Sequence, residues 1–270
     1  MLVSQGIEST IERALETGGW QLVVDEKDSQ RALQTLRQWK VENRGPVWRQ
    51  TLPWKGLVFD WRNLAWFLLL GLIFVLDETR DSYLTRAGMM DRQAVWAGQW
   101  WRLFTAVTLH RDIAHLASNL AAGVLLLGLA MGSFGSGVGL LAAYLAGVAG
   151  NLAGLFLYTG RHLSLGASGM IFGALGLLSG QMVGLLRAGF TPRQLAMRSV
   201  LSGFLFLVLF GLNPDSDVLA HAGGFLAGVL FGALLAIWPN RLSENAVANR
   251  LAEFLCGFLV ILTWWRALGQ

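Results

Sequence analysis

Residues 113–131 (IAHLASNLAAGVLLLGLAM) and residues 138–158 (VGLLAAYLAGVAGNLAGLFLY) are two long apolar runs, separated by a short turn that is rich in glycine. A helix of about twenty residues crosses the hydrocarbon of a bilayer, which is about 30 Å thick. Neither run alternates apolar and polar residues, as the strands of a membrane barrel do. Each run is therefore predicted to be a membrane-spanning helix.

Similar apolar runs recur along most of the chain. Hydrophobic residues make up 54% of the 270 residues and charged residues 14%, whereas about a quarter of the residues in soluble proteins are charged. The pattern predicts an all-α polytopic membrane protein, because only helices and closed barrels pair all their backbone groups in hydrocarbon. The seven predicted spans are residues 63–76, 113–131, 138–158, 163–186, 199–212, 218–238 and 254–265.

The composition also excludes two classes of protein. The single cysteine, Cys256, cannot form a disulfide within the chain, which excludes a disulfide-stapled secreted domain. The net charge of +4 is small and evenly spread along the sequence. A nucleic-acid partner is therefore not expected.

Residues 1–60 differ in kind from the rest of the chain. They carry acids, bases, glutamine and tryptophan, and they lack the basic segment and apolar core of a signal peptide. Residues 20–25 (WQLVVD) are typical of a strand, and the pattern from Ser29 to about Asn43 is typical of a helix. We expect a small α+β head, whose function the residues do not indicate.

The distribution of positive charge predicts the orientation of the chain. With the N-terminus inside, fourteen of the 21 Lys and Arg residues lie on the inner side, as the positive-inside rule requires. The short loop 213–217 (NPDSD) is acidic and lies outside in this arrangement. We expect a multi-pass protein with a cytosolic head, and we place it in the inner (cell) membrane of a bacterium.

Polar side chains are rare inside the predicted spans, and four of them are expected at one level. His115 and Asn119 are four residues apart, so they share one face of the second span. Ser168 lies early in the fourth span and His221 early in the sixth. Because these three spans run in the same direction, the four side chains are expected to converge near the outer surface.

This set of side chains suits nucleophilic acyl transfer. A serine hydroxyl becomes a good nucleophile when a base accepts its proton, and a neutral imidazole suits that task. We therefore assign Ser168 as the nucleophile and His221 as its base. The Asn119 amide and a His115 N–H group can stabilise the oxyanion. Since no acidic residue lies within the spans to orient the base, a Ser-His dyad is expected instead of a triad.

Glycines surround both predicted catalytic residues. Gly166 and Gly169 flank the nucleophile, where they let backbone and substrate approach closely. Gly224 and Gly228 follow the base at helical spacing. Small residues let two membrane helices pack closely, which is needed if a serine oxygen and an imidazole nitrogen are to come within about 3 Å.

At these positions the chain resembles the rhomboid family of intramembrane serine proteases. The shared motifs are WR at Trp101-Arg102, HxxxxHxxxN at residues 110–119, GxSG at residues 166–169 and AHxxGxxxG at residues 220–228. They occur in the family's order and on the corresponding spans, and the match covers about residues 60–240. Each motif is weak by itself, but together they are specific.

The resemblance implies a rhomboid-like six-helix protease core over residues 61–240. Residues 241–270 would be the extra C-terminal transmembrane helix that some members carry, behind an N-terminal cytosolic domain at residues 1–60. It also implies a Ser-His dyad that opens to the outer side. The dyad would cleave transmembrane segments of substrate proteins near their outer ends.

Several residues near the predicted site are expected to be structural. Trp101 and Arg102 would anchor the interface and staple the first outer loop. His110 would make a hydrogen bond in the loop or interface near His115. His162 is expected to be a solvated loop residue.

The chain departs from the rhomboid pattern at two places. The turn at residues 131–137 (MGSFGSG) lacks the glutamate that many members place there. Phe172 stands one turn after the nucleophile, where many members have a tyrosine that packs against the catalytic histidine. A phenyl ring can still pack against the imidazole of His221.

Three other functions fit parts of this pattern. A zinc protease could use His110, His115 and His221, but there is no HExxH helix and no carboxylate near them. A transporter is expected to show broken midplane helices and a charged pathway. The polar residues of these spans lie instead near one end of the spans. A noncatalytic rhomboid-like protein that binds transmembrane helices stays open as the alternative.

The expected partners are transmembrane substrates and the lipid bilayer. No metal or cofactor is expected, and the residues do not indicate the oligomeric state.

Overall fold

The computed structural model describes residues 2–13, 19–42, 58–187, 193–211, 216–237 and 241–269. The chain divides into two compact units, Met1–Trp54 and Lys55–Gln270. Each unit has its own hydrophobic clusters and is considered by itself.

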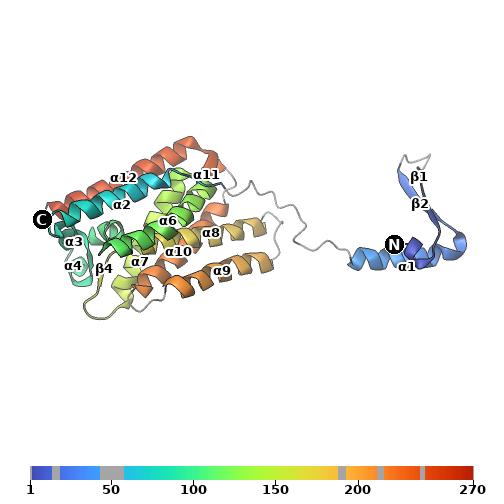
Figure 1. Ribbon diagram of the computed structural model, residues 1–270, viewed down its shortest axis with the longest axis horizontal. Coiled ribbons are helices and arrows are strands. Elements are labelled where there is room, and N and C mark those ends of the chain that lie inside the picture. The colour runs from blue at the N-terminus through green and yellow to red at the C-terminus, as the bar shows by residue number, and fades with distance from the viewer. Residues whose placement is uncertain are drawn as a thin grey trace. The chain divides into compact units, whose positions relative to one another are not determined.

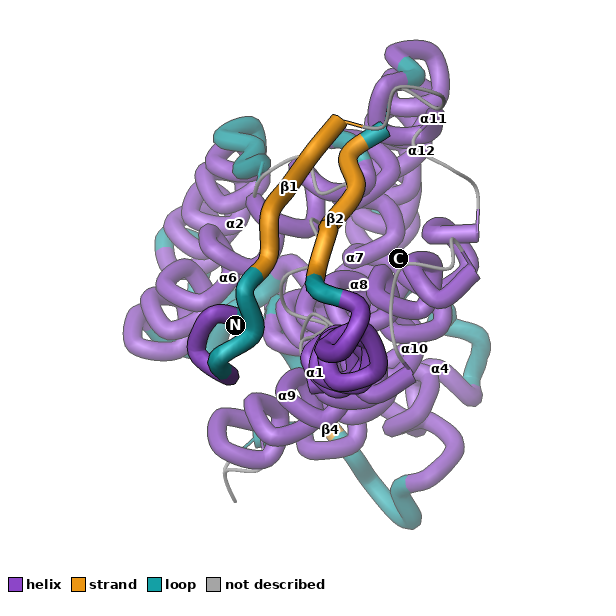
Figure 2. Tube along the Cα trace, turned by 90° about the vertical axis from the view of Figure 1, so that its right-hand side faces the viewer, coloured by secondary structure: helices purple, strands orange, loops and turns teal. Residues whose placement is uncertain are grey.

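The N-terminal unit is a hairpin followed by a helix (Figure 2). Strand β1 (Ser9–Arg13) pairs antiparallel with β2 (Trp20–Val24), and α1 (Ser29–Glu42) follows. Leu2, Ile7 and Ala32 form a small buried cluster. The predicted strand and helix are both found. Strand β1 was not predicted, because its residues STIER are mostly polar and exposed and give no apolar signal.

The second unit is mostly helical, and its long helices fall on the predicted apolar runs (Figure 1). The long helices are α2 (Asn63–Glu78), α6 (Ile113–Phe134), α7 (Ser136–Leu157), α8 (Ser168–Arg187), α9 (Arg193–Gly211), α10 (Val218–Ile237) and α12 (Ala246–Leu268).

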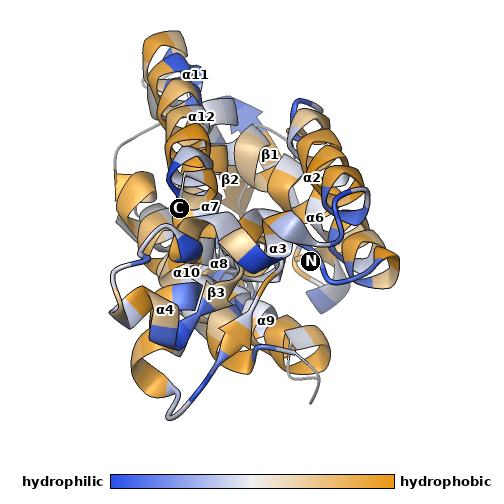
Figure 3. Ribbon diagram, turned by 90° about the vertical axis from the view of Figure 1, so that its left-hand side faces the viewer, coloured by the Kyte–Doolittle hydropathy of each residue, from blue (hydrophilic) through white to orange (hydrophobic). Residues whose placement is uncertain are grey.

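The apolar character of these helices is plain in Figure 3, where hydrophilic residues gather mainly in loops and at helix ends. Among the described residues, α6, α7, α10 and α12 are each long and apolar enough to cross a membrane, and Met197–Gly211 is a shorter apolar helix. Most of the side chains that they turn outward are large and hydrophobic.

Three of the predicted spans begin at clearly different residues in the structure, the fifth at Arg193 instead of residue 199. The fourth begins at Ser168 and not at residue 163, because Leu163–Ser164 form a short strand, β4. The seventh is twice as long as its apolar run. It begins at Ala246, capped by the Asn245 side chain, and the polar residues Asn249 and Glu253 in its first turns bond to the start of α7.

The segment between α2 and α6 is a structured loop. Its elements are α3 (Tyr83–Gly88), β3 (Met90–Asp91), α4 (Arg92–Trp96), α5 (Arg102–Thr105) and a 3-10 turn at Ala106–Thr108. Strand β3 pairs antiparallel with β4, so this loop holds the segment that leads into α8.

The Trp101-Arg102 pair holds this loop together. The Arg102 guanidinium donates hydrogen bonds to the backbone oxygens of Met89 (2.7 Å) and Arg86 (3.1 Å) and to the side chain of Gln99 (2.6 Å). Trp101 is buried beside it. These contacts lie within the loop, and none of them involves Ser168 or His221.

Helices α7, α8 and α10 pack together at the centre of this unit, and α9 and α12 lie toward its edges (Figure 1). The contact between α8 and α10 is the most extensive of all. Glycines line it from both sides. A Cβ atom at Gly224 would overlap the carbonyl of Gly169, and one at Gly228 would overlap the carbonyl of Gly173. The two backbones therefore lie closer together than any larger residue would allow.

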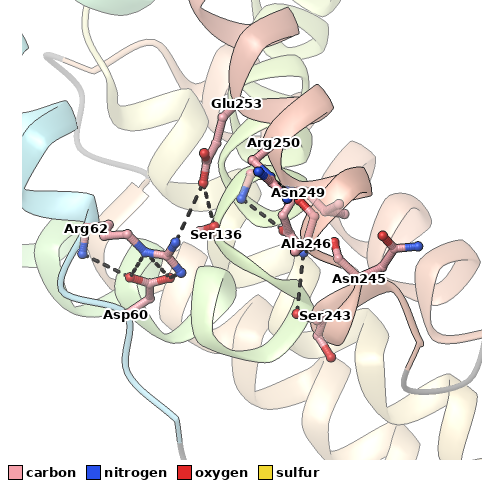
Figure 4. Close-up of polar contacts among 11 residues, drawn as sticks. Asp60, Arg62, Ser136, Ser243, Asn245, Ala246, Asn249, Arg250 and Glu253 are labelled. Atoms are coloured by element: carbon pink, nitrogen blue, oxygen red, sulfur yellow. Dashed lines mark hydrogen bonds and ion pairs between the residues drawn. The ribbon is translucent and has the colours of Figure 1, made fainter.

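Helix α12 holds the start of α7 by polar contacts (Figure 4). The Asn249 side-chain oxygen accepts hydrogen bonds from the backbone N–H groups of Gly137 (3.1 Å) and Val138 (3.2 Å). Ser136 Oγ donates to Glu253 at 2.5 Å. The turn that lacks a glutamate of its own is thus supplied with one by the C-terminal helix.

Candidate active site

Ser168 and His221 are brought together by the contact between α8 and α10. Their Oγ and Nε2 atoms lie 2.7 Å apart. The other ring nitrogen of His221, Nδ1, lies 2.7 Å from the backbone oxygen of Gly211, at the end of α9. A carbonyl only accepts hydrogen bonds, so Nδ1 carries the proton and Nε2 is free to accept one from the serine.

Helix α8 begins at the serine itself. Gly166 has φ of +134°, which a residue with a side chain rarely adopts, and its N–H donates to Ala106 in the 3-10 turn. The chain turns there and enters the helix with Ser168 in its first position. The backbone N–H groups of a helix's first turn have no acceptor within the helix, so they point toward the space around Ser168.

His115 lies beside this turn. A Cβ atom at Gly166 would come within 2.8 Å of the His115 ring and 3.6 Å of Ser168 Oγ. The Asp112 side chain caps α6 by accepting from the His115 N–H at 2.8 Å. The structure therefore places His115, Ser168 and His221 around one point, at the starts of α6, α8 and α10.

Asn119 lies one turn further along α6 on the face that carries His115. Its side chain is buried, with 5% of its surface exposed, and Nδ2 has no hydrogen-bond partner among the described residues. The Nδ1 atom of His115 is likewise without a partner there. A buried donor without a partner is costly, and active sites keep such donors for bound groups.

Two aromatic side chains pack around the site. Phe172, one turn after Ser168, lies with its ring centre 4.7 Å from that of His221. His110 packs edge-on against His115 at 5.3 Å. Burial, together with the nearby His115, lowers the pKa of His110 to about 3. The expected hydrogen bond of His110 is not found among the described residues, where both of its ring nitrogens are buried without a partner.

Sequence reasoning missed three groups near the dyad. The Gly211 carbonyl is a backbone atom and gives no sequence signal. His162, expected to be solvated, is mostly buried and lies 2.9 Å from the Asp217 carboxylate. Asp217 in turn caps α10 by accepting from the Ala220 N–H at 3.0 Å. An acidic residue four positions before a candidate base was the available signal.

The sequence of this chain is similar to those of several known proteins. The chain matches the Rhomboid domain family over residues 97–238, which is more than half of its length. It is 32% identical over 176 residues to "Rhomboid protease GluP" of Bacillus subtilis, covering 62% of this chain and 33% of that protein. It is 26% identical over 231 residues to "Rhomboid-like protease 3" of Toxoplasma gondii, covering 83% of each.

A plant relative is similar over a comparable stretch. The chain is 29% identical over 162 residues to "RHOMBOID-like protein 5" of Arabidopsis thaliana, covering 58% of this chain and 51% of that protein. The chain thus spans about a third of the bacterial relative and about half of the plant one. With a Rhomboid domain over most of its helical unit and several helices that can span a membrane, the chain is an integral membrane protein that belongs to the rhomboid family.

Proposed function

We propose that this chain is an intramembrane serine endopeptidase that cleaves transmembrane segments of other membrane proteins. The observation that carries the proposal is the 2.7 Å contact between Ser168 Oγ and His221 Nε2. That distance allows a base to accept the proton of an attacking hydroxyl. The similarity to relatives that are named proteases supports the same class of reaction.

The chemistry follows from the two side chains. Ser168 Oγ attacks the scissile carbonyl while His221 Nε2 accepts its proton, and an oxyanion forms. His221 then gives the proton to the leaving amine, which leaves an acyl-enzyme at Ser168. Water, deprotonated by His221, then attacks the acyl group; His221 returns that proton to the departing Ser168 oxygen, and the acyl group leaves as a carboxylic acid.

The Gly211 carbonyl takes the orienting role that an aspartate has in a triad. It accepts a hydrogen bond from the Nδ1–H group of His221 at 2.7 Å, which holds the ring with Nε2 toward Ser168. Its partial negative charge also favours the imidazolium that forms when the serine proton is transferred. A dyad can therefore work here without a carboxylate beside the histidine.

Three groups are positioned to stabilise the oxyanion. The first is the Ser168 N–H, at the start of α8, where the helix dipole favours negative charge. The others are the side chains of His115 and Asn119, which offer donors without a partner among the described residues. Such preorganised donors stabilise the transition state more than the bound substrate.

The wider setting of the reaction is part of the same proposal. The starts of α6, α8 and α10 face the outer side and the N-terminal unit faces the cytosol, as the charge distribution predicts. Seven helices cross the bilayer, with residues 61–240 as the protease core, residues 241–270 as the extra helix and residues 1–60 as the head. The substrates are transmembrane segments that are cut near their outer ends, and the membrane is a bacterial inner membrane.

The central experiment compares two serines of the same helix. Ser168→Ala removes the nucleophile, so labelling by a fluorophosphonate and cleavage of a generic transmembrane substrate should both be abolished. Ser179→Ala is the matched control. Ser179 is buried in α8 and donates to the Leu175 carbonyl, away from the dyad. This variant should keep both activities, and the site of cutting in the substrate can be located by mass.

The noncatalytic alternative makes a different prediction in the same assay. If the wild-type protein binds the transmembrane substrate but is neither labelled nor able to cleave it, the chain is a helix-binding protein and the proposed reaction is wrong. If Ser168→Ala is still labelled, another residue is the nucleophile.

The oxyanion donors should give a graded loss. His115→Ala and Asn119→Ala each remove one donor, which is typically worth about 3 to 4 kcal/mol, or roughly two to three orders of magnitude in rate. Cleavage should be weak but measurable, whereas Ser168→Ala with His221→Ala should look like either single variant, because the pair acts as a unit. Losses that only follow the fraction of folded protein would argue against these roles.

A further inference from the structure

Asp217 lies at a junction of three segments. Its Oδ2 atom lies 2.9 Å from His162 Nε2, in the loop that leads to Ser168. Its Oδ1 atom accepts from Tyr158 Oη at 3.2 Å, at the end of α7, and from the Ala220 N–H at 3.0 Å, in the first turn of α10. One carboxylate therefore joins the end of α7, the loop and the start of α10. We call Asp217, His162 and Tyr158 the loop clasp.

The side chains of the loop clasp are largely buried and pack against one another. The side chains of His162 and Asp217 are only 18% and 14% exposed. The rings of Tyr158 and His162 stack at 3.9 Å between centres. Burial raises the pKa of Asp217, but hydrogen bonds from His162, Ser164 and the Ala220 N–H outweigh it and lower that pKa to about 2. The carboxylate is therefore ionised at neutral pH, and both of its oxygens accept hydrogen bonds.

The clasp is close in the chain to both members of the dyad. The Asp217 backbone oxygen accepts from the His221 N–H at 3.0 Å, so the same residue closes the turn that carries the base. On the other side, His162 is followed within six residues by the nucleophile. The opposite edge of the loop is held by β3 and β4 and by the Gly166 N–H bond to Ala106.

We propose, on the basis of the proposed function, that Asp217 and His162 are positioning residues, which set the loop before Ser168 against the helix turn that carries His221. Neither residue touches the reacting atoms. Their contribution is to hold the serine, its backbone N–H and the imidazole in one geometry. A misplacement of about 1 Å can lower a rate by about a hundredfold.

The first variant removes the oxygen that accepts from His162 but keeps the helix cap. In Asp217→Asn the remaining oxygen can still accept from the Ala220 N–H, since asparagine caps helices as well as aspartate does. The amide nitrogen cannot accept from His162. We expect kcat for cleavage, and the second-order rate of fluorophosphonate labelling, to fall about ten- to a hundredfold. KM should change little, because the substrate-binding surface is intact.

Asp91→Asn is the matched control. Asp91 is also an aspartate that caps a helix, accepting from the Gln93 N–H at 2.9 Å, and it lies on the strand that pairs with the same loop. Its substitution makes the same chemical change without touching the clasp. It should leave kcat and the labelling rate within about twofold of wild type.

Two further variants separate positioning from general destabilisation. His162→Ala should lower kcat as Asp217→Asn does, and the double variant should be no slower than the slower single one, because both remove one contact. His162→Gln keeps a donor that can reach the carboxylate, so it should recover much of the lost kcat. Loss of folded protein alone would give no such rescue.

The outcomes distinguish this inference from the proposed function. Wild-type protein that neither cleaves nor is labelled overturns the protease itself. Active wild type with Asp217→Asn and His162→Ala both at the rate of Asp91→Asn overturns the positioning role while leaving the protease intact. Additive losses in the double variant, or a rise in KM without a fall in kcat, would also overturn it.

Discussion

Helix α8 meets its two neighbours in different ways. Against α10 it packs through glycines, and the backbones of the two helices touch. Against α9 it packs through large side chains, with Phe172 and Leu207 buried together beside Phe225. The two residues that we propose as nucleophile and base, Ser168 and His221, lie on the two helices whose backbones touch.

The two contacts differ in how rigidly they hold the site: the α8–α10 contact fixes the dyad, whereas the α8–α9 contact holds the Gly211 carbonyl more loosely. Backbone contact leaves no side-chain rotamers to adjust, so the 2.7 Å separation of the dyad is set by the helices themselves. The Gly211 carbonyl that orients the histidine comes instead from α9. Most of the large side chains of this helix are exposed and not packed against its neighbours: Leu201, Phe204, Leu205, Phe206, Val208, Leu209 and Phe210. The position of the orienting carbonyl thus depends on a few side-chain contacts.

The sharpest way to break the comparison is to add one methyl group to the α8–α10 contact. In Gly224→Ala the new Cβ would overlap the Gly169 carbonyl, so the helices must separate and the dyad with them. We expect a loss of about 1 to 3 kcal/mol in stability and a fall in cleavage of about a hundredfold or more.

The control for this change is Gly257→Ala, in α12, where no atom lies within 4 Å of the added methyl group. It should leave activity unchanged and stabilise the helix slightly, since alanine is the better helix former. Thermal unfolding and labelling rates of the two variants measure the contrast. Equal behaviour of the two would show that the close backbone contact is not what holds the dyad.

A smaller effect is expected at the α8–α9 contact. Leu207→Ala removes the buried side chain, 3% exposed, that packs α9 on Phe172 and Phe225. The Gly211 carbonyl can then shift from His221, so labelling should slow by about tenfold. The stability cost should lie near the lower end of about 2 to 5 kcal/mol, because a hydrocarbon surrounding weakens the penalty for exposing apolar surface.

Leu209→Ala makes the same change on the exposed side of the same helix, where the side chain is 67% exposed. It should alter neither the labelling rate nor the thermal midpoint beyond experimental scatter. A slower rate in Leu209→Ala than in Leu207→Ala would indicate that α9 acts through its outer face, contrary to the comparison.

The smallest effect concerns pH and the start of α10. Because the pKa of Asp217 is lowered to about 2, while an unfolded aspartate has a pKa near 3.9, the carboxylate stabilises the fold fully above about pH 4. That contribution is lost as the pH falls toward 2. The difference in thermal midpoint between wild type and Asp217→Asn should therefore be constant from pH 7 to about 4 and shrink below it. A difference that persists unchanged at pH 2 would contradict the lowered pKa.

Much of the helical unit could be predicted from residues alone. Long apolar runs leave little choice of structure in a bilayer, so the positions of the helices followed from composition and length. The starts of α8, α9 and α12 differed from the prediction, and those of α8 and α12 show why. In both, residues outside the helical pattern make contacts to distant segments: Leu163–Ser164 pair with β3, and Glu253 accepts from Ser136.

The candidate site divides in the same way. Ser168, His115, Asn119 and His221 are rare polar side chains in apolar runs, and their chemistry and direction along the chain indicated that they would meet. The Gly211 carbonyl and the pairing of His162 with Asp217 could not be predicted. Every residue has a carbonyl, and a loop histidine looks solvated until the fold places a carboxylate beside it.

The amino-acid order was thus sufficient for the membrane class, the approximate helices and the choice of the polar side chains proposed to react, because hydrophobic length and chemical type are local properties. Folding in three dimensions determined the distance between Ser168 and His221, the tautomer of the histidine and the partners of Asp217. These depend on how closely helix backbones approach, and on which groups far apart in the chain lie side by side.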